Sequence, residues 1–215
     1  MRFHRWGHPV ACFRAGIQRA KAWLQKGEYL FVRWQLPALL MLLLIGVGIG
    51  ALLYQKSNTA AYWLSRFSTE YVIARAKNSF GAVFGLSFRP LRLIYGCLLL
   101  NGVSLTGVGT IPPILMFVGL GMGMSLGCFF QQNDRQILLC TLLAMLPYCT
   151  CVGALLALQA QEGIRLSAHL LRAVYYQTAT ECFIFSCFAR RSAIVFAGLC
   201  ICAICNTALT RLLLI

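Results

Sequence analysis

The chain has 215 residues, of which 60% are hydrophobic and 11% charged, against about 45–50% and about 25% in an average soluble domain. Its 19 lysines and arginines outnumber its 5 acidic residues, which gives a formal net charge of +14. These numbers exclude a secreted disulfide scaffold, a disordered tail and an ordinary cytosolic enzyme. Because the charges lie between the apolar runs, they are typical of membrane-flanking residues and not of a nucleic-acid-binding face. The sequence therefore predicts an all-α, polytopic membrane helix bundle.

Five apolar segments are long enough to cross a bilayer as helices. The first follows a basic amino-terminal segment, residues 1–35, and is bracketed by Trp34 and Tyr54, whose rings favour the membrane interface. The charge-free stretch from Leu93 to Asn133 is too long for one helix and right for two. The predicted spans are 36–54, 90–107, 111–130, 136–158 and 192–210, all within a single membrane domain, 36–215.

Two interruptions are predicted from prolines. Gly107–Pro113 contains two glycines and two prolines, which break a helix, so we expect a hairpin turn there. Pro147 lies inside the predicted fourth span, where it removes one helical N–H and frees the carbonyl of Leu143. We therefore expect a kink at Pro147.

Residues 163–190 admit two interpretations. Arg165, His169 and Arg172 form one polar stripe at helical spacing, which is typical of an amphipathic helix at the bilayer surface. Residues 173–189 are apolar enough to enter the membrane, but Glu181 would be costly at the bilayer centre. We expect five spans plus amphipathic interfacial helices, with six spans as the alternative.

Residues 55–88 form the predicted amphipathic, extracytoplasmic connector. Its aromatic residues Trp63, Phe67 and Tyr71 recur at helical spacing and are a candidate partner surface. The alternative is that they only cover the ends of the spans.

The orientation of the chain is predicted from its basic residues. With the amino terminus inside, eleven of the 19 lysines and arginines fall on the inner side and the remaining eight on the outer side. Cytoplasmic loops carry the excess of basic residues in membrane proteins. We therefore expect a multi-pass protein of the cell membrane with a cytoplasmic amino terminus.

Small residues repeat along two of the predicted spans. Gly119, Gly123 and Gly127 recur every fourth residue in the third span, and Gly46 and Gly50 repeat this spacing in the first. Such flat helix faces let two backbones approach closely in lipid. The glycines therefore predict tight helix packing within the bundle or, alternatively, packing against a partner's helix.

Residue types that carry chemistry are sparse. The 11 cysteines lie mostly in apolar runs without histidines nearby, so we expect small hydrophobic side chains and no metal site. The histidines, His4, His8 and His169, lie in basic segments, and paired carboxylates are absent from the predicted spans. The sequence predicts no catalytic residue, metal or cofactor. A scaffold or anchor and a permease or transporter subunit remain, whereas an enzyme lacks the residues it would need.

Six short segments follow one another in a recognisable order. They are Gly46-Val-Gly-Ile-Gly-Ala-Leu-Leu53, Phe88-Arg-Pro-Leu-Arg-Leu-Ile94, Leu105-Thr-Gly-Val-Gly-Thr-Ile-Pro112, Gly119-Leu-Gly-Met-Gly-Met-Ser-Leu-Gly127, Met145-Leu-Pro147 and Asn206-Thr-Ala-Leu-Thr210. In this order, over about residues 25–215, the chain resembles the stage II sporulation protein M family of endospore-forming bacteria.

The resemblance implies a non-enzymatic membrane scaffold of the engulfment machinery. Such a scaffold localises two peptidoglycan-degrading partners, a lytic transglycosylase and an amidase, and lies among membrane lipids without binding nucleic acid. Only the glycine and proline positions are carried over from the family. The alternative function is a permease or transporter-like membrane subunit.

Overall fold

The computed structural model describes residues 34–56, 80–131, 143, 145–176 and 182–214. These residues form helices and no strand, which confirms the all-α fold class. The expectations for the segment before residue 34, for Trp63, Phe67 and Tyr71 and for Glu181 fall outside the described residues. The chain divides into two compact units, Met1–Pro37 and Ala38–Ile215, and all contacts below lie within the second.

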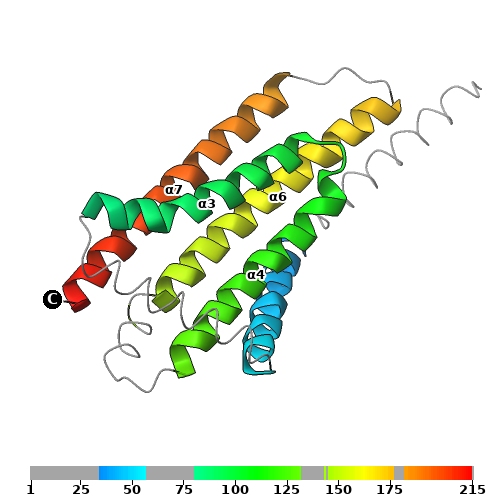
Figure 1. Cartoon of the computed structure of the whole chain (residues 1–215). Helices are drawn as coiled ribbons and strands as arrows, with labels where there is room; N and C mark the ends of the chain where they lie inside the picture. The colour runs from blue at the N-terminus through cyan, green and yellow to red at the C-terminus, as the bar shows by residue number, and fades with distance from the viewer. Residues whose placement is uncertain (1–33, 57–79, 132–142, 144, 177–181, 215) are drawn as a thin grey trace, which may run out of the picture. The chain divides into compact units, whose positions relative to one another are not determined.

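Five long helices are found in the described residues (Figure 1). They are the first helix (Trp34–Lys56), α3 (Phe80–Val103), α4 (Gly107–Gln131), α6 (Leu146–Tyr176) and α7 (Cys182–Leu214). All of them except α6 contain a segment long and apolar enough to cross a membrane, which supports a multi-pass membrane protein.

The α3–α4 hairpin turns at Ser104–Thr106, before the glycine- and proline-rich segment where the turn was expected. Pro112 and Pro113 lie inside α4, and α3 begins at Phe80, within the expected connector. Local hydrogen bonding is one of two reasons. The carbonyls of Ser104 and Thr106 accept from the backbone N–H groups of Gly107, Gly109 and Thr110 at 3.0–3.2 Å.

A buried serine on α6 completes the start of α4. Ser167 Oγ accepts from the N–H of Val108 at 3.2 Å and donates to the carbonyl of Ser104 at 2.7 Å. The first four N–H groups of a helix lack intrahelical partners, and here all four find one. The hairpin is therefore fixed by a contact distant in sequence, which the turn residues alone do not reveal.

Helix α6 joins two segments that the sequence analysis separated. It begins at Leu146 and runs for 31 residues to Tyr176, so residues 146–158 of the expected fourth span and the Arg165–Arg172 stripe belong to one helix. Pro147 is the second residue of α6, and the expected kink there stays a prediction. Leu143 and Met145, just before it, have the wider geometry of a π-helix.

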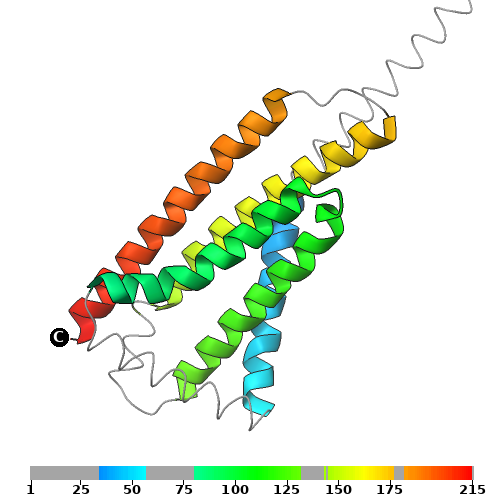
Figure 2. The same cartoon turned by 45° about the horizontal axis from the view of Figure 1, so that its top comes forward.

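Helix α6 is the centre of the bundle, because it contacts every other described helix. A side chain at Gly153 would meet Leu43 of the first helix, and one at Gly163 would meet Ile111 of α4 and Gly102 of α3. Figures 1 and 2 show α6 between α7 and α4, with α3 running across it and also in contact with α7.

The first helix and α4 run parallel and in backbone contact. A Cβ atom at Gly46 would lie 2.5 Å from the carbonyl oxygen of Met116, and one at Gly119 would collide with the carbonyl of Leu43. The same holds for Gly50 against Leu120 and for Gly123 against Val47, while Gly127 lies against the Tyr54 ring. The two glycine faces cover each other, so neither is open to a partner's helix here.

We predict that Gly123→Leu lowers the unfolding free energy by about 3 kcal/mol, the upper end of overpacking costs, because the backbone of Val47 cannot move aside. The matched control is Gly121→Leu, since a side chain there meets nothing within 4 Å. Thermal unfolding of the detergent-solubilised chain measures both. Equal losses of stability would contradict this backbone contact.

Candidate functional site: a polar seam between α6 and α7

Polar side chains gather where the central helix α6 meets α7. We call this group the polar seam, and it consists of Gln159, Glu162 and Arg165 on α6 and Arg191 and Ser192 on α7. Gln159 is fully buried and Ser192 nearly so. Buried polar groups in a membrane bundle are costly unless they are paired, and they are functional-site candidates for that reason.

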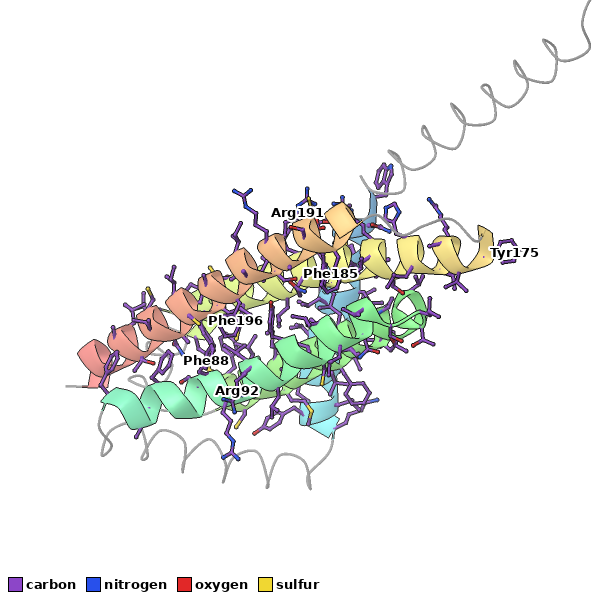
Figure 3. The ribbon with its side chains drawn as sticks, turned by 90° about the horizontal axis from the view of Figure 1, so that it is seen from above. Phe88, Arg92, Tyr175, Phe185, Arg191 and Phe196 are labelled. Atoms are coloured by element: carbon purple, nitrogen blue, oxygen red, sulfur yellow. The ribbon has the colours of Figure 1, made fainter. Side chains whose placement is uncertain are left out.

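The deeper half of the seam ties three helices together. Gln159 Nε2 donates to Ser192 Oγ at 2.9 Å, and Tyr95 of α3 donates its hydroxyl to the Ser192 carbonyl at 2.9 Å. Phe196, one turn further along α7, packs against the rings of Tyr95 and Phe88 with centroids 5.2 and 5.8 Å apart (Figure 3). A small polar network and an aromatic cluster therefore join α3, α6 and α7.

The other half of the seam is ionic. Glu162 Oε1 accepts from Arg165 Nη1 at 2.8 Å and from Arg191 Nη1 at 2.7 Å. The Glu162 side chain is 19% exposed, that of Arg165 27% and that of Arg191 57%. Two guanidinium groups thus share one carboxylate, so the cluster has a net positive charge.

The seam lies near one end of the bundle. Gly163 packs against Gly102, close to the carboxyl end of α3, and Ser167 binds the hairpin turn itself. Glu162 is five residues before Ser167, or about 7.5 Å along a helix axis. This depth fits the boundary between headgroups and acyl chains better than the centre of a bilayer, where an ion pair would be more costly.

Two buried polar atoms of the seam are unpaired. Gln159 Oε1 and Arg165 Nε have no hydrogen-bond partner among the described residues. An unsatisfied buried acceptor or donor costs about 1–3 kcal/mol. The seam therefore retains one acceptor and one donor that the fold does not use.

The predicted site residues are placed in three different ways. The glycines Gly46, Gly50, Gly119, Gly123 and Gly127 meet between the first helix and α4, and Pro147 starts α6. The aromatic partner surface, Trp63, Phe67 and Tyr71, lies outside the described residues. The described cysteines are free thiols, and no three metal-ligating side chains cluster within the described ranges.

Sequence analysis missed the polar seam because the fourth span was ended before Glu162. A signal was available, since Gln159, Glu162 and Arg165 recur every third residue and so share one helix face. A hydropathy criterion hides this signal, because those same residues lower the mean hydropathy of α6.

Comparison with protein-family models, curated proteins and solved structures finds no match for the chain.

The Gln159–Ser192 pair yields a stability prediction. Ser192→Ala should cost about 1–3 kcal/mol, because it leaves the Gln159 amide buried without its partner. Adding Gln159→Leu should recover most of this loss, since both polar groups are then replaced by apolar ones. Thermal unfolding of the two single variants and the double variant measures the coupling between Gln159 and Ser192. A loss of stability in the double variant equal to the sum of the single losses would contradict this coupling.

The ion pairs yield a second prediction, an order of stabilities. Glu162→Gln should destabilise more than Arg191→Gln, because it leaves two guanidinium groups without their shared carboxylate. The exposed Arg191 pair should contribute no more than about 1 kcal/mol. Denaturant unfolding in detergent compares the two variants, and the reverse order would show that Arg165 does not depend on Glu162.

Proposed function

We propose that the chain is a non-enzymatic, multi-pass membrane scaffold that holds partner proteins at the cell membrane. The observation that carries this proposal is the packing of the bundle. The first helix and α4 interlock through glycines, and α6 packs against the other helices, so the bundle is tightly packed. Its outward faces carry large apolar side chains, which suit contact with lipid or with a partner's transmembrane helix.

We propose partners of the peptidoglycan-degrading class, a lytic transglycosylase and an amidase, on the basis of the sequence resemblance to the stage II sporulation protein M family. The process would then be engulfment during sporulation. The partner-binding faces are proposed to be the outer faces of the first helix and α7 and the connector at residues 55–88, because the two glycine faces already cover each other.

We also propose that the amino terminus is cytoplasmic. The first helix and α4 run in the same direction, so the α3–α4 hairpin lies at the end of the bundle where the first helix begins. Arg172, Arg190 and Arg191 are exposed at or beyond the polar seam near that end. Basic residues favour the cytoplasmic side, which supports this orientation.

Co-purification tests the scaffold. The tagged chain, extracted from membranes of cells that make both wall hydrolases, should retain at least one of them. Two double variants probe the outer faces, since all four side chains are exposed. They are Met41→Trp with Leu44→Trp on the first helix and Ile194→Trp with Ile201→Trp on α7. One pair of variants should lose the hydrolase at unchanged thermal stability. Loss of neither hydrolase with either pair would contradict partner binding through these helix faces.

A permease-like subunit is the second candidate function, and the unpaired Gln159 Oε1 and Arg165 Nε favour it. Transporters bind their substrates through polar groups inside the helix bundle. Reconstituted vesicles containing only this chain distinguish the two functions. Solute flux that Gln159→Leu abolishes would support the permease, whereas co-purified hydrolase without flux supports the scaffold.

A further inference from the structure

The end of the bundle that holds the polar seam concentrates positive charge on two neighbouring helices. Arg165 projects from α6, and Arg190 and Arg191 from α7, while Glu162 is the only acidic residue in the described part of the chain. Two guanidinium groups therefore bind this carboxylate, and Arg190, next to Arg191 in the chain, adds a third positive charge, which favours an anion at this position.

These arginines keep hydrogen-bond donors in reserve. Glu162 occupies Nη1 of Arg165 and Nη1 of Arg191, whereas a guanidinium group has five N–H donors in a planar fork. Arg165 Nε itself is buried, but the rest of the Arg165 side chain is part-exposed at 27%, and the side chains of Arg190 and Arg191 are exposed. Paired N–H donors in this geometry match the oxygens of a phosphate group.

An apolar strip on α7 continues from the arginines toward the middle of the bundle. Arg190, Ile194 and Ile201 recur at intervals that place them on one helix face, and the two isoleucines are 65% and 60% exposed. At 1.5 Å per residue, the strip from Arg190 to Ile201 covers about 16 Å. The arginines at the membrane boundary match the phosphate headgroup of a phospholipid, and the exposed apolar strip beside them matches its acyl chain.

We propose that Arg165, Arg190 and Arg191 bind the phosphate of an anionic phospholipid whose acyl chain lies along Ile194 and Ile201 of α7. The excess of guanidinium groups over carboxylates selects a headgroup with a net negative charge over a zwitterionic one, whose cation these arginines repel. The site lies beyond the proposed scaffold function and does not depend on it, although a partner's helix on the Ile194–Ile201 face of α7 would compete with the acyl chain.

The experiment uses the full chain purified in a neutral detergent. Dioleoylphosphatidylglycerol, dioleoylphosphatidylcholine and inorganic phosphate are titrated separately, with thermal unfolding and native mass spectrometry as measurements. Phosphatidylglycerol should raise the midpoint of unfolding and remain bound, and the other two should do neither. A rise of equal size with inorganic phosphate would show an anion site without a lipid, and a rise of equal size with phosphatidylcholine would show no headgroup selection. Either result would overturn the proposal.

Two sets of variants locate the site. Arg190→Gln with Arg191→Gln should weaken phosphatidylglycerol binding about fivefold per arginine removed. Arg89→Gln with Arg92→Gln removes the same charge from exposed positions on α3 and should leave binding unchanged. Equal weakening by both pairs would show attraction to net charge alone and overturn the site. Arg190→Gln alone, which spares the Arg191–Glu162 pair, replaces the double variant if that one unfolds.

Discussion

The hydrocarbon core of a membrane offers no hydrogen bonds, and this constraint explains the position of α6. The helix carries Gln159, Glu162 and Arg165, and each would be costly if exposed to lipid tails. In the structure the other helices pack against it on most sides, and Ser192, Arg191 and the hairpin turn pair with its polar groups. The four more apolar helices therefore shield the polar groups of α6 from lipid, while their own outward faces contact the lipid.

Small residues make this enclosure possible. Backbone contact between the first helix and α4 brings two helices together without side chains between them, and Gly163 allows a similar approach of α6 to Gly102 of α3. Since lipid supplies little hydrophobic drive for helix association, such close approach is the main source of packing energy. The proposed scaffold would benefit from this arrangement, because its outer surfaces would keep a fixed spacing while partners bind.

Periodic features could be predicted from the sequence, and features that depend on distant contacts could not. The spacing of Gly119, Gly123 and Gly127 indicated a flat helix face, although not which helix covers it. The hairpin turn lies earlier than the prolines suggested because Ser167, remote in sequence, binds the first turn of α4. Likewise, α6 was divided before Glu162, since a single sequence does not show that a polar residue will be enclosed by neighbouring helices.

We propose that α6, which lacks a segment apolar enough to cross a membrane by itself, crosses it inside the bundle. In a variant without native cysteines, single cysteines at Leu146 and Tyr175 mark its two ends, and both positions are exposed. A membrane-impermeant maleimide applied to sealed vesicles of either orientation should label the two positions from opposite faces, with Tyr175→Cys reacting from the cytoplasmic side. Labelling of both positions from the same face would contradict a membrane-spanning α6.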